Sequence, residues 1–226
     1  SVSVVVATNR PDMTERIFNT VKQQDHKNLE LVLALHGEGF EDSYPNFFES
    51  NIAVTVLRYP KETIFGSVLS EASSVASGEW IAKMDDDDWY GEEHISDLLL
   101  AAGYSDADLV GKGSEFVYLT QEDMTIRRDL GDSEVESRTI GGGAMLVKAE
   151  IFREINGWRE LSSGVDVALI DDVVSNGGRV WRTHPFGYLL RRTKNQHTWE
   201  VDDKYFLRQA DQQWEGFASE LVGVLD

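Results

Sequence analysis

Hydrophobic residues along this chain fall into short runs that alternate with segments in which they recur at helical spacing. The run at 2–7 is rich in valine, and such β-branched runs are typical of a strand buried on both faces. Over 14–24, Ile17 and Val21 follow one face of a helix. The same reasoning predicts three further strands and one helix of small residues in the first half, at 29–35, 52–57, 80–84 and 66–77 respectively.

The predicted order of elements in the first half is strand, helix, strand, strand, helix, strand. This order is typical of an α/β protein with a mostly parallel sheet. Ligands of such sheets bind beyond the carboxyl ends of the strands. The segments 8–10, 36–38 and 85–88 each follow a predicted strand. We therefore expect these three segments to lie together at one edge of the sheet.

The second half of the chain has a less regular pattern. Helices are predicted at 93–102, 149–155 and 165–175, and strands at 108–110, 114–119, 144–147, 180–182 and 186–192. The segment 127–138 is strongly charged and is interpreted as a connection, and the acidic chain from 202 onward is predicted to be helical. No repeat or clear linker divides the chain, so we expect a single domain over 1–226.

Four consecutive aspartates, at 85–88, follow the predicted strand at 80–84 directly. Ionised carboxylates packed this closely repel one another and lose solvation, unless a cation or a shared proton relieves them. Hard divalent cations prefer such oxygen ligands, and nucleoside diphosphates carry these cations with them. The alternative interpretation is a solvated acidic loop. We predict a divalent metal site here, for Mn²⁺ or Mg²⁺.

Composition narrows the classes of partner. The net charge of −19 argues against nucleic acid and anionic lipid, because both require basic surfaces. No apolar run approaches the roughly 20 residues that span a bilayer. Cysteine is absent, which excludes disulfides and thiolate chemistry and favours a reducing, cytoplasmic location. The chain begins without Met and without a basic leader, as expected of one domain of a longer polypeptide.

Three motifs together resemble family 2 glycosyltransferases of the GT-A fold. They are Thr8-Asn9-Arg10-Pro11 after the first strand, the block at 78–88, and the later Gly-Val-Asp that ends at Asp166. The block at 78–88 is the most specific motif, because it follows the family pattern Gly-Glu-Tyr-Ile-x-Phe-Leu-Asp-x-Asp-Asp closely. The resemblance extends over 2–199, nearly the whole chain.

The resemblance implies an α/β, GT-A-type fold, in which a Rossmann-like, mostly parallel sheet is joined by a smaller mixed sheet on the acceptor side. Residues 1–88 would form the nucleotide-binding half and 89–226 the acceptor-side half. The implied reaction moves a sugar, with inversion and metal dependence, from a nucleoside-diphosphate sugar to a hydroxyl of a glycan or other acceptor. A UDP-sugar is the favoured donor, and synthesis of a bacterial cell-surface polysaccharide or other glycan is the expected context.

The resemblance also implies roles for individual residues. Asp87 would be a metal ligand, and His197 would complete the metal shell, although a surface histidine is an equally good interpretation. Asp166 would be the catalytic base, because it retains the second member of the family's Glu-Asp pair. The residues expected to bind the nucleotide sugar are Thr8, Asn9, Arg10, Glu38, Gly66, Asp85 and Asp86.

Two departures from the family pattern leave parts of this assignment open. His36 and Glu38 stand in a loop that often supplies an acidic residue to the nucleotide base, and 69–71 lacks the usual Arg-Asn pair. On the acceptor side, Gly142 and Gly143 are interpreted as a tight backbone passage, or simply as a turn. Trp199 is a candidate platform for stacking a sugar.

The reaction itself requires both a metal site and a catalytic base. A diphosphate leaving group gains negative charge that a divalent cation stabilises, and an acceptor hydroxyl needs a carboxylate to take its proton. Three other interpretations remain: a sugar nucleotidyltransferase, a non-catalytic domain that binds glycans or sugar nucleotides, and an EF-hand-like calcium module. The EF-hand offsets at 86–97 include a tyrosine in place of an oxygen ligand, and the segment before them is strand-like.

Overall fold

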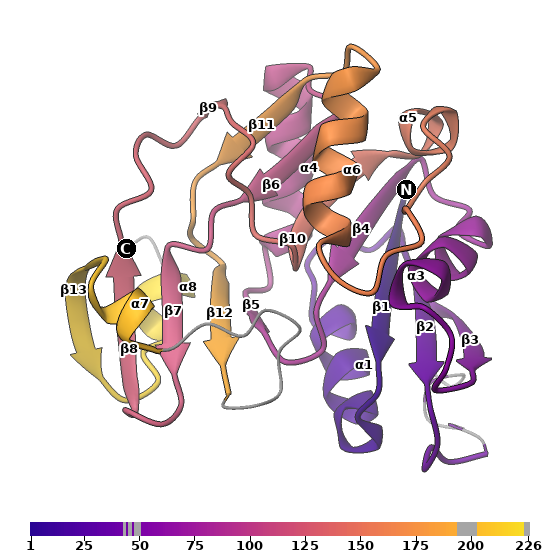
Figure 1. Ribbon diagram of the computed structural model, residues 1–226, viewed down its shortest axis with the longest axis horizontal. Coiled ribbons are helices and arrows are strands. Elements are labelled where there is room, and N and C mark those ends of the chain that lie inside the picture. Colours follow the sequence, from indigo (N-terminus) through magenta and orange to yellow (C-terminus); the bar gives the residue numbers. More distant parts are fainter. Residues whose placement is uncertain (43, 45–46, 48–50, 194–202, 224–226) are drawn as a thin grey trace.

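A central sheet of eight strands forms the framework of the protein (Figure 1). The computed structural model describes residues 1–42, 44, 47, 51–193 and 203–223. In their order across the sheet, the strands are β3 (Ala53–Tyr59), β2 (Leu29–His36), β1 (Val2–Thr8), β4 (Trp80–Met84), β10 (Ala144–Lys148), β6 (Leu109–Lys112), β11 (Val180–Thr183) and β9 (Val135–Glu136). The first four run parallel to one another, so their carboxyl ends meet at one edge.

The central sheet changes direction at β10, which lies antiparallel between β4 and β6. Ala144, the first residue of β10, pairs with Met84, the last residue of β4. This register places the three glycines before β10 beside the aspartates that follow β4. Two segments about sixty positions apart in the sequence are thereby brought to the same corner of the sheet.

A second, five-stranded sheet stands beside the first (Figure 1). Its order is β13 (Ala210–Glu215), β8 (Met124–Arg128), β7 (Phe116–Leu119), β12 (Tyr188–Arg192) and β5 (Trp89–Tyr90). The edge strand β5 pairs with β12 through Tyr90 and Tyr188. Because β5 begins directly after Asp88, the acidic segment connects β4 of the first sheet to β5 of the second.

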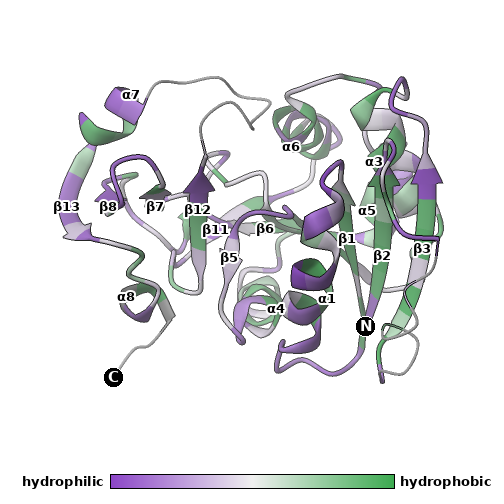
Figure 2. Cartoon of the chain, turned by 90° about the horizontal axis from the view of Figure 1, so that it is seen from below, coloured by the Kyte–Doolittle hydropathy of each residue, from purple (hydrophilic) through white to green (hydrophobic). Residues whose placement is uncertain are grey.

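Helices cover both faces of the central sheet (Figure 2). α1 (Thr14–Lys22) and α4 (His94–Ser105) lie on one face, and α3 (Phe65–Ser74), α5 (Ala149–Glu154) and α6 (Val165–Ser175) lie on the other. Strand β1 shows why both faces are apolar: Val4 and Val6 pack in the first cluster, whereas Val5 packs in the second. The remaining short helices are η1 (Pro11–Met13), α7 (Asp203–Leu207) and α8 (Glu220–Gly223).

The predicted α/β fold, with a large mostly parallel sheet and a smaller mixed sheet, is confirmed. Three details differ. The segment 127–138, interpreted as a connection, contains the end of β8 and the strand β9. The short strand β5 was not predicted. The chain from 202 onward is not helical throughout, because β13 lies between α7 and α8. Polar β13 becomes a strand through its antiparallel pairing with β8, a case in which tertiary context overrides local propensity.

Membrane-spanning helices are not found in the described part of the chain, where no helix is both long and apolar enough.

His94 begins α4 and is completely buried, which makes the stability of the fold depend on pH. Burial, followed by the nearby Lys112 ammonium, holds the pKa of His94 well below its usual value. Below about pH 6.5, His94 therefore binds a proton in the unfolded chain but stays neutral in the folded chain. As a result, the free energy of unfolding falls by up to about 1.4 kcal/mol per pH unit. Above that pH the His94 contribution to stability is fully present.

Between pH 6.5 and 5 the unfolding free energy should fall less steeply with pH in His94→Gln than in the unaltered chain. The difference in slope should correspond to about one bound proton. Urea unfolding of the unaltered chain and the variant at pH 7.5, 6.5, 5.5 and 5 measures the two slopes. Parallel curves for the two proteins would show that His94 does not carry this pH dependence.

Candidate active site

A cavity of about 500 Å³ opens at the carboxyl edge of β1 and β4. This is the edge where ligands of parallel sheets bind. Most of its wall comes from the loop after β1, the end of β4 and the start of α6. The lining residues are Ala7, Thr8, Asn9, Arg10, His36, Glu62, Thr63, Ile64, Phe65, Lys83, Asp85, Asp86, Asp87, Ser162, Ser163, Gly164, Val165 and Asp166.

Arg10 binds the acidic segment from the β1 side of the cavity. Its Nε donates to Asp86 Oδ2 at 2.9 Å, and its Nη1 donates to Asp87 Oδ2 at 3.1 Å. Thr8 Oγ1 adds a hydrogen bond of 2.5 Å to Asp86 Oδ2. Charge-assisted bonds of this kind are stronger than neutral ones. Arg10 thus offsets part of the charge that the consecutive carboxylates concentrate here.

Asp87 and Asp88 have different surroundings although they are neighbours. Burial and the nearby Asp86 and Asp85 charges raise the pKa of Asp87 to about 6, against the opposing effect of Arg10. Asp88 faces the second sheet, where its Oδ2 accepts from the Tyr188 hydroxyl at 2.8 Å and its Oδ1 from the Arg191 backbone N–H at 2.9 Å. Asp88 therefore fixes the segment, whereas Asp85, Asp86 and Asp87 line the cavity.

Asp166 also lines this cavity, from the first turn of α6. Gly164 precedes the helix in the left-handed region, with φ of 71°, a conformation that favours glycine. Asp166 Oδ1 forms an ion pair of 3.2 Å with Lys83 Nζ. Burial raises the pKa of Asp166, and the Lys83 ammonium opposes that rise. A carboxylate with a raised pKa, facing a cavity, has the character of a general base.

The glycines at 141–143 let the loop before β10 touch the carboxylates. A Cβ atom at Gly142 would overlap the Asp166 carboxylate, and one at Gly143 would lie 2.8 Å from both Asp85 Oδ2 and Asp88 Oδ2. The two glycines are thus required by close packing, which agrees with a tight backbone passage.

Two residues predicted to bind the donor do not line this cavity as the described residues define it. Glu38 is exposed in the loop after β2. Gly66 is buried, and its N–H donates to the Leu161 carbonyl at 2.9 Å, so it holds the segment that leads into α6. Their roles in donor binding stay predictions. His197 and Trp199 lie outside the described residues, and so do their predicted roles.

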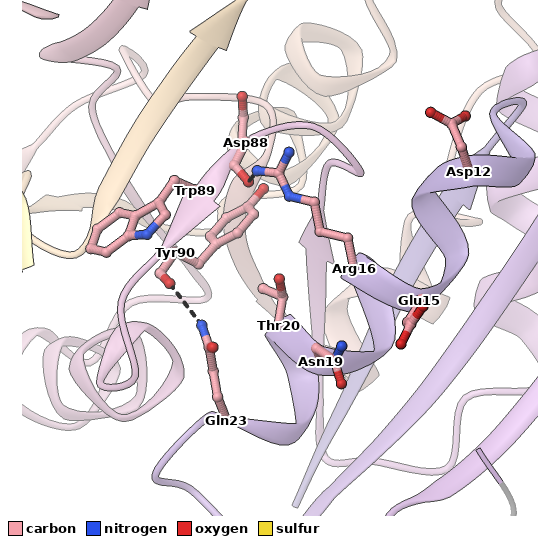
Figure 3. Close-up of a pocket in the computed structure, with 9 residues that line it drawn as sticks. All are labelled: Asp12, Glu15, Arg16, Asn19, Thr20, Gln23, Asp88, Trp89 and Tyr90. Carbon is pink, nitrogen blue, oxygen red and sulfur yellow. Dashed lines mark hydrogen bonds between the residues drawn. The ribbon is translucent and has the colours of Figure 1, made fainter. Parts of the chain in front are cut away.

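A second cavity, of about 490 Å³, lies on the other side of the acidic segment, between α1 and β5 (Figure 3). Arg16 reaches across it and donates to the backbone carbonyls of Asp87 and Asp88, at 3.0 and 2.8 Å. Gln23 Nε2 donates to the Tyr90 carbonyl at 3.2 Å. Side chains of α1 therefore hold the backbone of the acidic segment from behind, while Arg10 holds its carboxylates in front.

The sequence of the first half decides the family. The profile described as Glycosyl transferase family 2 matches residues 3–130, which cover β1, β4 and the acidic segment. The chain belongs to glycosyltransferase family 2. The resemblance drawn from the motifs is confirmed.

Solved glycosyltransferases share the fold. The mannosyltransferase PcManGT from Pyrobaculum calidifontis, in complex with GDP-Man and Mn²⁺, superposes with a TM-score of 0.67 at 14% identity over 86% of this chain and 58% of that one. S. aureus TarS 1–349 in complex with UDP-GlcNAc gives 0.67 at 17% identity over 92% and 64%. The chain thus spans less than two thirds of either protein. Among curated proteins, none matches it.

Proposed function

We propose that this glycosyltransferase moves a sugar from a nucleoside-diphosphate sugar to a hydroxyl acceptor, with inversion and with a divalent metal. The observation that carries the proposal is one cavity that contains Arg10, the carboxylates of Asp85 to Asp87, and Asp166. Cavities of roughly 300–1,000 Å³ suit small-molecule ligands and cofactors. Fold neighbours in complex with GDP-Man and UDP-GlcNAc support a donor of this class.

The donor-binding wall is proposed to consist of Thr8, Asn9, Arg10, Asp85 and Asp86. Thr8 ends β1 and the next two residues follow it, while Asp85 and Asp86 follow β4, so all five face the cavity from adjacent parallel strands. A UDP-sugar remains the donor we favour, and a GDP-sugar is the alternative that the mannosyltransferase neighbour suggests.

The carboxylate oxygens of the acidic segment are suitable ligands for a divalent cation. Asp87, whose pKa is raised by burial and by the other carboxylates, would hold the ion. Within the described residues, no three His, Cys, Asp or Glu side chains form a complete metal cluster. Magnesium commonly binds through one or two carboxylates together with substrate phosphates, so an incomplete protein shell is suitable. When bound, the cation would stabilise charge on the diphosphate leaving group.

Asp166 is proposed to take the proton of the acceptor hydroxyl. Its side chain is 29% exposed and lines the same cavity as Asp85 and Asp87. The proposed base and the proposed metal ligand Asp87 come from separate elements, α6 and the segment that follows β4, which supports a division of roles between them. Gly142 and Gly143 would border the acceptor through their backbones.

The chain is proposed to act as one domain, with 1–88 binding the nucleotide and 89–226 facing the acceptor. Strands from both halves, β4 from the first and β10 from the second, pair within the central sheet, which supports a single unit.

Calorimetric titration of UDP and of GDP, first with Mn²⁺ and then with a chelator, tests the proposal. We expect one of the two nucleotides to bind, and to bind more tightly with Mn²⁺. Equal affinity in the two conditions would remove the metal from the proposal, and no binding of either nucleotide would remove the donor.

A further inference from the structure

Lys83 is a charged residue in the middle of the buried strand β4. Its side chain is only 4% exposed, and its neighbours Ala82 and Met84 are core residues. Burying an ammonium group is costly unless the charge is paired and its hydrogen bonds are made. The partners of the ammonium therefore indicate what Lys83 does.

The ammonium reaches the edge of the cavity and meets three oxygens there. Nζ lies 2.7 Å from Asp85 Oδ1, 2.8 Å from the Gly142 carbonyl and 3.2 Å from Asp166 Oδ1. The contacts with Asp85 and Gly142 are hydrogen bonds, and the contact with Asp166 is an ion pair. Both Asp166 and Asp85 raise the pKa of Lys83 against the effect of burial, so the group is a fixed cation.

The three partners come from three separate parts of the chain. Asp85 follows β4, Gly142 precedes β10, and Asp166 belongs to α6. Asp166 is held on both sides, because Lys83 binds its Oδ1 and the backbone of Gly142 packs against its Oδ2. A carboxylate restrained in this way has few other orientations.

We infer that Lys83 is a positioning residue for the transfer reaction: it fixes the Asp166 carboxylate relative to Asp85, and so places the base with respect to the donor. The inference rests on the proposed function. A shift of about 1 Å in a catalytic group can cost about 10²-fold in rate, so a restraint on Asp166 has a measurable effect on turnover.

Charge compensation alone is the competing explanation, and a second lysine separates the two. Lys112 in β6 is fully buried, and its Nζ donates to Asp97 Oδ2 at 2.7 Å and to the Phe186 carbonyl. It does not line the cavity. Lys112→Met therefore removes a comparable buried ammonium from a carboxylate without touching the site.

The test compares Lys83→Met with Lys112→Met. With Mn²⁺ present, the release of UDP from UDP-GlcNAc and of GDP from GDP-mannose gives kcat and KM with water as the acceptor. We expect Lys83→Met to lower kcat by about 10²-fold with KM changed by less than about threefold. Lys112→Met should keep kcat while lowering the unfolding midpoint. Should Lys83→Met not fold, Lys83→Arg keeps the charge but not the ammonium geometry, and should still lower kcat.

The double variant with Asp166→Asn and Lys83→Met tests whether Lys83 acts through Asp166. In the Asp166→Asn background, adding Lys83→Met should lower kcat by less than about threefold, because residues that act as a unit are not additive. The inference would be overturned if the two single-variant losses in kcat multiplied in the double variant. It would also be overturned if Lys83→Met changed only KM, or if both Lys83 variants kept the turnover of the unaltered chain. None of these outcomes would contradict the proposed function. No nucleotide release by the unaltered chain, with no binding of UDP or GDP, would overturn the proposed function and the role of Lys83 with it.

Discussion

Replacing Asp166 with asparagine should lower turnover by about 10²–10⁴-fold, the range that general-base catalysis contributes. Asparagine keeps the shape of the side chain but cannot accept a proton from an acceptor hydroxyl. Lys83 retains Asp85 and the Gly142 carbonyl as partners in this variant, so the cavity should keep its form. Donor affinity should therefore stay within a few-fold of the unaltered chain, and the loss should fall on kcat.

Asp171 provides a matched control on the same helix. It is half-exposed and pairs with Arg138 at 3.2 Å, away from the cavity. Asp171→Asn removes the same charge from α6 and should leave nucleotide release unchanged. Turnover of Asp166→Asn at the level of the unaltered chain would show that another group is the base.

Replacing Asp87 with alanine should remove the Mn²⁺ dependence of nucleotide binding. Groups that only support metal ligands cost about 10–100-fold in metal affinity when they are lost, so a direct ligand should cost at least about 100-fold. The variant also relieves crowding among buried carboxylates, and Arg10 keeps Asp86 as a partner. Binding in the presence of a chelator should therefore be little affected.

Calorimetry with Mn²⁺ and nucleotide measures this effect, and Asp12→Ala is the control. Asp12 is an exposed acid in η1, and it lines the cavity behind the acidic segment rather than the one in front. It tests whether the loss of one negative charge nearby is sufficient. A similar fall in affinity for both variants would mean that Asp87 is not a ligand.

The first half of the fold could be predicted well because its signals are long and simple. The valine-rich strand β1 and the amphipathic helix α1 each carry a clear period. The strands β5 and β13 could not be found in the same way. β5 has two residues, and β13 is polar, so each depends on a partner strand that lies far away in the sequence.

The site was predictable to the extent that it follows from strand ends. Arg10 and Asp87 follow adjacent parallel strands, and the sheet brings them together as expected. The contact of Lys83 with Asp166 was missed, because it depends on how α6 docks against β4. Periodicity gives no such information. A lysine inside an otherwise apolar strand was nevertheless a visible signal, since a buried charge requires a partner.

Asp88 makes one short stretch of backbone common to both sheets. Tyr188 and the Arg191 N–H, both in β12, hold its carboxylate, while the preceding aspartates face the cavity at the carboxyl edge of β1 and β4. The position of the acidic segment is thus tied to the position of β12. Substitutions in β12 offer a way to shift the acidic segment without changing any residue that lines this cavity.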